Sequence, residues 1–239
     1  NDQIEFDSLS GLASIVGNEG QDSIFVNELT GSLIIDGSNG SVFLSITSAD
    51  GNVSIKGDMS GDDQILIGSI GSSGNLDNLN LGAGDDTAYV SIASGNLNID
   101  GGDGSDLLSI DSAEGSISLN GGSGDDTIHG SSISGNVSID GGSGNDQINL
   151  DSVAGLVSIV GMAGSDSIIV DTLTSDGSVI VNNSSGGSMF ISIHSADGTL
   201  SIQGTNSGDD QLYIDSIGSN GNFDSLNLGS GNDTIQVSN

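Results

Sequence analysis

The chain has 239 residues, of which 33% are hydrophobic and 3% aromatic, too few for the thick core of a globular domain of this length. It contains one Lys or Arg against 33 Asp and Glu. The formal net charge of −32 excludes nucleic-acid binding, which needs cations to displace phosphate counterions, and disfavours anionic membrane surfaces. The absence of Cys excludes disulfides and thiolate metal sites, and no run of about 20 apolar residues predicts membrane insertion.

A Gly-rich turn that closes on an aspartate recurs along the chain, and alternating aliphatic and polar residues follow each turn. From Asp106 to Asp166 the closing aspartates stand 20 residues apart. A fixed period of this kind is typical of a solenoid, in which each repeat forms one coil. In chain order the closing aspartates are Asp22, Asp63, Asp86, Asp106, Asp126, Asp146, Asp166, Asp210 and Asp233.

One period illustrates the predicted elements of a coil. Gly141–Asp146 reads GGSGND, and its glycines suit a turn with positive φ. Gln147–Leu150 alternates polar and aliphatic residues as a strand does. Asp151–Gly155 predicts a second turn with an aliphatic residue at its middle, and Leu156–Val160 predicts a second strand.

The same aliphatic positions recur in neighbouring coils, which predicts five aliphatic ladders along the axis. No window has the 3.6-residue apolar period of a helix. The sequence therefore predicts an all-β, parallel β-solenoid similar to a β-roll, with two short strands and two turns per coil of about 20 residues and about 11–12 coils. A β-sandwich is the alternative, but it would not keep its register from coil to coil.

A longer repeat is superimposed on the coils. Asn1–Gly17 returns as Asn145–Gly161, and Ser60–Thr87 returns as Ser207–Thr234. The offset grows from 144 to 147 residues, which predicts a small insertion near Thr174–Gly177. We expect residues 1–239 to form a single continuous β-solenoid in which the module 1–144 is partly duplicated as 145–239.

The irregularities of the pattern recur as well. The closing aspartate is missing around Ser38–Val42 and again around Ser185–Met189. Coils of 23 residues separate Asp63 from Asp86 and Asp210 from Asp233. Neither end of the chain has the polar cap that solenoids use, so we expect a segment of a longer chain or ends that bind copies of the chain.

The turns resemble the calcium-binding nonapeptide repeats of the RTX (hemolysin-type) family. The resemblance is carried by IDGGDGSDLLSI at Ile99–Ile110, LNGGSGDDTI at Leu119–Ile128 and IDGGSGNDQINL at Ile139–Leu150. It implies a parallel β-roll in which Ca²⁺ lies between successive turns and is held by turn carbonyls and closing aspartates. It therefore implies metal ligands at Asp22, Asp63, Asp86, Asp106, Asp126, Asp146, Asp166, Asp210 and Asp233, and at Asp2 if another coil precedes it.

The chain departs from the family in one respect. The family motif recurs about every nine residues and serves both edges of the roll, whereas here it occurs once per coil. We therefore expect calcium along one edge only. The second edge should be packed by its central aliphatic residue and by Ser or Asp hydrogen bonds.

The Gly-rich turns are also compatible with roles other than calcium binding. Each aspartate could instead cap its own turn by bonding its own backbone, and a phosphate-cradling loop would need a following helix and a lysine. No catalytic constellation is visible, because His129 and His194 have no repeated or paired context and are expected to be solvated surface residues. Acid pairs such as Asp125–Asp126 could resemble the two carboxylates of a glycosidase, but they recur in several coils. Ion sites recur in this way and active sites do not, so the recurrence favours ion binding.

The sequence therefore predicts a non-enzymatic, calcium-binding structural segment of an extracellular, bacterial cell-surface fibre or adhesin stalk. Ca²⁺ between stacked turns would fold and rigidify it, and it could stack on neighbouring repeats or polymerise end to end. One alternative is an RTX-type calcium-dependent secretion or folding module attached to a secreted enzyme. A minor alternative is an ice-binding solenoid, which the absence of a Thr-x-Thr ladder disfavours.

Overall fold

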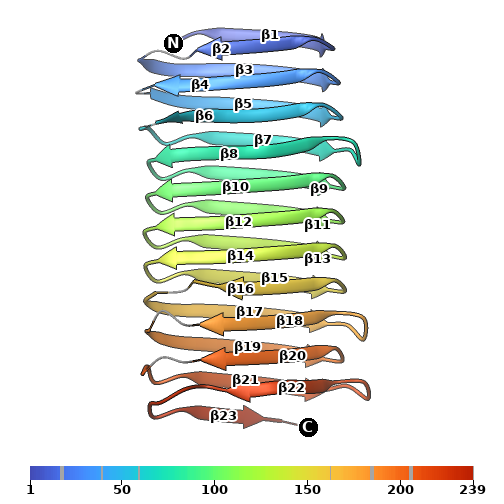
Figure 1. Ribbon diagram of the computed structural model, residues 1–239, viewed down its shortest axis with the longest axis vertical. Helices are drawn as coiled ribbons and strands as arrows, with labels where there is room; N and C mark the ends of the chain where they lie inside the picture. Colours follow the sequence, from blue (N-terminus) through green and yellow to red (C-terminus); the bar gives the residue numbers. More distant parts are fainter. Residues whose placement is uncertain are drawn as a thin grey trace.

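In the computed structural model the chain forms one stack of coils that follow each other in sequence order (Figure 1). The structure describes residues 1–16, 19–38, 40–58, 60–161, 163–183, 186–204 and 207–238, and no helix occurs in these ranges. Each coil adds one strand to each of two parallel sheets. The predicted all-β parallel β-solenoid is confirmed. Gly17, Asn39, Ser185 and Asn239, which bound or interrupt the predicted repeats, lie outside the described residues.

The odd-numbered strands form a twelve-stranded sheet, called sheet A here. Its strands are β1 (Gln3–Leu9), β3 (Gly20–Leu29), β5 (Gly40–Ala49), β7 (Gln64–Ile70), β9 (Thr87–Ala93), β11 (Leu107–Ala113), β13 (Thr127–Ile133), β15 (Gln147–Val153), β17 (Ser165–Leu173), β19 (Ser188–Ala196), β21 (Gln211–Ile217) and β23 (Thr234–Val237).

The even-numbered strands form the eleven-stranded sheet B. Its strands are β2 (Leu12–Val16), β4 (Ser32–Ser38), β6 (Asn52–Asp58), β8 (Asn75–Ala83), β10 (Asn96–Asp103), β12 (Ser116–Ser123), β14 (Asn136–Ser143), β16 (Leu156–Val160), β18 (Ser178–Asn183), β20 (Thr199–Gly204) and β22 (Asn222–Asn227).

Each strand pairs with the equivalent strand one coil away, which removes the long crossover that parallel strands otherwise need. In β13 and β15 the partners are Ile128 with Ile148 and Ile133 with Val153, so equivalent positions lie directly over each other. The side-chain period of a strand is two, and this register therefore keeps every aliphatic position on the inner face.

The predicted aliphatic ladders form the core between the two sheets. Burial of one Val, Leu or Ile side chain contributes about 1.5–3 kcal/mol, and the coils repeat this contribution along the axis. The middle residue of the second turn is part of the same core. All of the following predicted core residues are buried: Leu108, Ile110, Ala113, Ile117, Leu119, Ile128, Ile133, Val137, Ile139, Ile148, Leu150, Val153, Val157, Ile159, Ile168, Val170 and Leu173.

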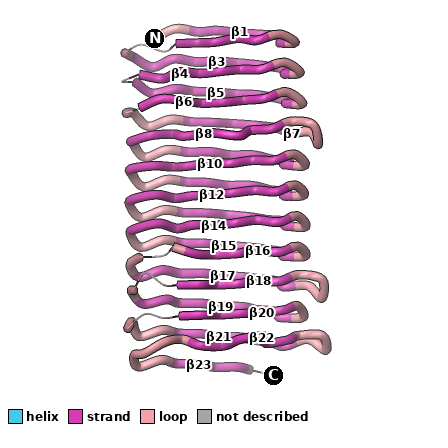
Figure 2. Tube along the Cα trace, in the orientation of Figure 1, coloured by secondary structure: helices cyan, strands magenta, loops and turns pink. Residues whose placement is uncertain are grey.

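Three of the second turns are longer than the others, between β7 and β8, β17 and β18, and β21 and β22 (Figure 2). Each is closed by a backbone hydrogen bond, from Gly74 N–H to Gly71 at 2.9 Å, from Gly177 to Thr174 at 2.9 Å and from Gly221 to Gly218 at 3.1 Å. The insertion predicted near Thr174–Gly177 thus lies in an enlarged second turn, where extra residues leave the sheets intact.

One predicted core position carries no side chain. Gly130 replaces the aliphatic residue of its ladder between Ile110 and Leu150, and a small void lies beside it. A methyl group at this position would meet the Cδ1 atom of Ile133 at 2.9 Å, and that atom is the flexible end of a side chain.

We therefore expect Gly130→Ala to raise the free energy of unfolding by about 0.5–1 kcal/mol, because it fills space and reduces the entropy of the unfolded chain. Urea unfolding followed by circular dichroism measures this change. Gly142→Ala is the control: Gly142 has φ of 93°, so an added side chain there should destabilise the chain. A loss of stability in Gly130→Ala would contradict this account of the core.

Candidate metal centre

The nine predicted aspartates lie in one column along the first edge, where each even-numbered strand turns into the next odd-numbered strand (left in Figure 1). Asp106 illustrates the local geometry, since it directly precedes β11. Gly102 and Gly104 of its turn have φ of 106° and 141°. This backbone conformation favours glycine. The turn carries the aspartate side chain into the interior of the stack, where Asp106 is 2% exposed.

Every one of the nine aspartates makes the same contact with the preceding coil. Its Oδ1 atom accepts a hydrogen bond from the backbone N–H of the equivalent residue one coil earlier, as Asp106 does from Asp86 at 2.8 Å and Asp146 does from Asp126 at 3.0 Å. The alternative in which each aspartate caps its own turn is therefore wrong, because the capped backbone belongs to the neighbouring coil. The full set of acceptors is Asp22, Asp63, Asp86, Asp106, Asp126, Asp146, Asp166, Asp210 and Asp233.

The second carboxylate oxygen behaves differently. In seven of these aspartates the Oδ2 atom is buried and has no hydrogen-bond partner. A buried polar atom without a partner costs about 1–3 kcal/mol, and an unpaired charge costs more. Asp22 and Asp233 belong to coils near the ends of the stack and are more exposed. The seven buried aspartates, called the inner row here, are Asp63, Asp86, Asp106, Asp126, Asp146, Asp166 and Asp210.

The first glycine of each turn leaves room for the Oδ2 atom. Gly141 does not have positive φ, but a methyl group on it would meet Asp146 Oδ2 at 2.6 Å. At Gly121 the same methyl position would collide with Asp126 Oδ2 and lies 2.5 Å from the carbonyl oxygen of Gly141 in the next coil. A carboxyl oxygen and a carbonyl oxygen therefore lie beside this glycine. When the carboxyl is ionised, neither oxygen carries a hydrogen to donate to the other.

Burial raises the pKa of the inner-row carboxyls. The pKa rises from the ordinary value of 3.8 to about 7 for Asp63, Asp86 and Asp126 and to about 6 for Asp146, with loss of hydration as the largest cause. The hydrogen bond from the preceding coil opposes the rise, and adjacent carboxylates of the row add to it at Asp86 and Asp126. The pKa is also raised by burial at Asp106, Asp166 and Asp210.

A second, exposed row lies one residue before the inner row. Here the bond runs in the opposite direction, because the side chain accepts from the N–H of the following coil, as Asp85 does from Ser105 at 2.9 Å and Asp125 does from Asn145 at 2.7 Å. The recurrence of the acid pairs was visible in the sequence, but their hydrogen bonds to the following coil were not predicted. The signal was present, since Asp, Asn or Ser occupies this position repeatedly and each can accept a hydrogen bond.

The oxygen atoms near the inner row determine which cation it could hold. Within the described ranges, no three His, Asp or Glu side chains converge on one point as a ready-made metal site. A cation in the row would therefore take most of its ligands from turn carbonyls and one or two from aspartates. Buried Oδ2 atoms without partners, next to carbonyl oxygens such as that of Gly141, fit a hard divalent cation that prefers oxygen.

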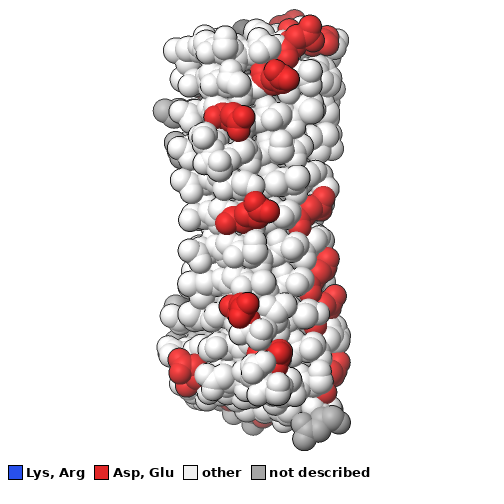
Figure 3. All heavy atoms as spheres, turned by 90° about the vertical axis from the view of Figure 1, so that its right-hand side faces the viewer, with Lys and Arg blue, Asp and Glu red and all other residues white. Residues whose placement is uncertain are grey.

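The second edge has a different construction. The carbonyl of its central aliphatic residue accepts two N–H groups of the next coil, as Ala113 does from Ser134 and Gly135 at 2.9 Å each. Backbone bonds therefore close this edge, with smaller side-chain contributions such as Asn220 N–H to Asp197 at 2.9 Å. Figure 3 looks onto this edge, where exposed acidic side chains are separated by uncharged ones.

The two histidines are not isolated, which corrects the expectation that they lack a paired context. His194 Nδ1 lies 2.8 Å from Asp171 Oδ1, and His129 Nε2 lies 3.3 Å from Asp151 Oδ1. Ser109 Oγ is 3.4 Å from the other ring nitrogen of His129. These contacts lie on the outer face of sheet A, half-exposed to solvent, and join coils that are one repeat apart.

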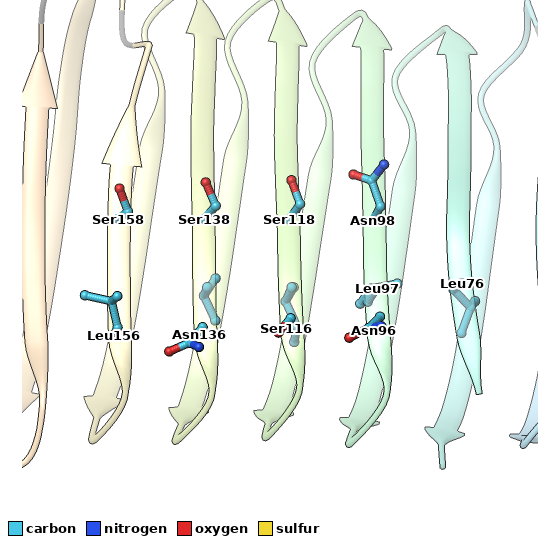
Figure 4. A pocket seen from close by; sticks show the side chains of 12 residues that line it. Leu76, Asn96, Leu97, Asn98, Ser116, Ser118, Asn136, Ser138, Leu156 and Ser158 are labelled. Atoms are coloured by element: carbon cyan, nitrogen blue, oxygen red, sulfur yellow. The ribbon is translucent and has the colours of Figure 1, made fainter. Parts of the chain in front are cut away.

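A shallow groove of about 600 Å³ crosses the outer face of sheet B over β8 to β16 (Figure 4). Two rows of side chains line it, one with Asn96, Ser116 and Asn136 and the other with Asn98, Ser118, Ser138 and Ser158. Asn96 donates to Asn75 Oδ1 at 3.2 Å along the first row. The groove is lined by Ser, Asn and aliphatic residues, none of which titrates.

Comparisons with known proteins give no relative: no family model, no curated protein and no solved structure matches this chain. Among the described residues there is no helix that is long and apolar enough to cross a membrane.

The raised pKa values predict how stability depends on pH when no divalent cation is present. The folded chain holds protons on the inner row that the unfolded chain releases, so stability is greatest near pH 4 and falls as the pH rises to about 7. Above pH 7 it should change little. Urea unfolding in a chelating buffer measures this profile, and a stability that rises between pH 4 and 7 would contradict it.

Proposed function

We propose that this chain is a non-enzymatic, calcium-binding structural segment of an extracellular fibre or adhesin stalk, and that its coils become rigid when Ca²⁺ binds along the first edge. The observation that carries the proposal is the inner row, in which seven buried Oδ2 atoms have no partner. Such atoms must be protonated or must face a cation. Above pH 7 these carboxyls lose their protons, and the chain has only one Lys or Arg to replace them.

Calcium suits this row better than other common cations. It accepts six to eight oxygen ligands with flexible geometry, whereas Mg²⁺ demands a near-ideal octahedron and keeps several waters. The Oδ2 atoms of the row are buried, so a cation bound there must exchange most of its waters for protein oxygens, which Mg²⁺ does reluctantly. The absence of Cys and the position of both histidines on the outer face of sheet A give no thiolate or imidazole ligand to the row.

The residues that would hold the ions are the nine aspartates of the column and Asp2, which precedes Asp22 in the stack, together with turn carbonyls such as that of Gly141. Bound Ca²⁺ would neutralise carboxylates that otherwise repel each other at a spacing of about 4.8 Å. Because the site exists only when coils are stacked, binding free energy becomes folding free energy. Millimolar calcium outside the cell would then favour folding after export.

A spacer is the role that suits this architecture. Each coil contacts only its neighbours, so the stack extends in one direction with a nearly constant cross-section. The repeated hydrogen bonds and ladders give each coil the same construction, and neighbouring repeats or another copy of the chain could continue the two sheets.

Calcium should therefore control stability at pH 8, where the inner row is deprotonated. We expect the unfolding midpoint in urea to rise by a large amount when EGTA is replaced by millimolar Ca²⁺, with each site adding about 2.7 kcal/mol at a hundredfold excess over its Kd. Circular dichroism with matched Mg²⁺ samples measures the effect. Equal stability in EGTA and in Ca²⁺ would rule out the proposal.

Substitution of one inner-row aspartate tests the role of its charge. Asp126→Asn keeps the acceptor for Asp106 N–H but removes a buried, unpaired charge, so in EGTA at pH 8 it should stabilise the chain by about 1–3 kcal/mol. In Ca²⁺ the same variant should gain less than the parent chain. Asp125→Asn, one residue away and exposed, is the matched control and should change either value by less than about 0.5 kcal/mol. If the two variants respond to Ca²⁺ alike, the inner row does not bind the ion.

A further inference from the structure

The column of inward side chains contains two residues that are not aspartates. The strand register places Val42 directly after Asp22 and Met189 directly after Asp166. Both side chains are buried, with exposed fractions of 5% for Val42 and 2% for Met189. They occupy equivalent positions in the two modules, 147 residues apart. The missing turn aspartates seen in the sequence are thus replaced by apolar side chains in the same interior position.

The stacking of coils continues through both positions. Val42 N–H donates to Asp63 Oδ1, and Met189 N–H donates to Asp210 Oδ1 at 2.8 Å, as the aspartates of the column do elsewhere. The N–H contact with the following coil is therefore kept, whereas the carboxylate is lost together with the side-chain acceptor that it would offer to the preceding coil. Neither a valine nor a thioether side chain is a ligand for a hard cation.

The loss of one carboxylate separates its neighbours. Across Val42 the nearest carboxylates belong to coils two strand spacings apart, about 9.6 Å, in place of about 4.8 Å. An ion that needs oxygens from two successive coils then lacks one of its side-chain ligands on either side of the break. In a solenoid each coil interacts only with its nearest neighbours, so a coil without a carboxylate interrupts the coupling between the ion sites on its two sides.

We propose that Val42 and Met189 divide the cation row into three segments that load independently, an inference that rests on the proposed calcium function. The central segment has six consecutive carboxylates and loads cooperatively, because each ordered coil lowers the cost of ordering the next. The outer segments are pairs and load separately. The segments are Asp2 with Asp22; Asp63, Asp86, Asp106, Asp126, Asp146 and Asp166; and Asp210 with Asp233.

Met189→Asp tests this division, with Met189→Leu as the matched control. Calcium binding is titrated at pH 8 by calorimetry, and bound ions are counted by equilibrium dialysis. The parent chain and Met189→Leu should bind Ca²⁺ in a cooperative phase and a separate weaker phase. Met189→Asp should join the central and C-terminal segments into a row of nine carboxylates, bind at least one more ion per chain and lose part of the weaker phase.

The outcomes separate this inference from the function on which it rests. If the parent chain binds no Ca²⁺, the proposed function fails. If the parent chain binds Ca²⁺ but Met189→Asp has the ion count and phases of Met189→Leu, the division into segments is wrong. Val42→Asp repeats the test at the other break. Failure of both aspartate variants to fold in Ca²⁺ would also overturn the inference, because the two positions would then not accept a ligand of the row.

Discussion

A row of carboxylates is buried within this stack of β-coils, and the construction of the coils has to accommodate that burial. Each inner-row aspartate uses one oxygen to bind the preceding coil, which makes it part of the stacking itself, as Asp106 does with Asp86. Its other oxygen is buried without a partner. The same residue therefore links two coils through one oxygen. When it is ionised and no cation lies beside it, its other oxygen raises the free energy of stacking those coils.

The turn requires glycine for two separate reasons, and both concern the position of the aspartate in the row. Gly102 and Gly104 adopt positive φ, which lets the chain turn sharply enough to direct Asp106 inward. Gly101 has no such conformation and is required because Asp106 Oδ2 occupies the space of a side chain there. The motif GGxGxD thus encodes both the shape of the turn and the place of its carboxylate.

The repeat period made most of the fold predictable, because a fixed coil length and alternating aliphatics leave one way to bury Ile148 and Val153 over Ile128 and Ile133. The column of nine aspartates followed from the same period. The direction of their hydrogen bonds could not be predicted, since it depends on the stagger between coils. The histidine contacts could not be predicted either, because Asp171 and His194 are 23 residues apart, against the usual 20, and only the register of β17 and β19 shows that they stand opposite each other.

The proposed function places calcium ions against the unpartnered oxygens of the inner row once these carboxyls are ionised, above pH 7. A crystal structure of the chain grown with Ca²⁺ at pH 8, in which anomalous scattering locates the ions, tests this placement. We expect anomalous peaks repeated from coil to coil, about 2.3–2.6 Å from the Oδ2 atoms, with breaks at Val42 and Met189. A row without peaks, in which each Oδ2 atom lies within hydrogen-bond distance of a neighbouring carbonyl, would show that protons occupy these positions and that the row does not bind calcium.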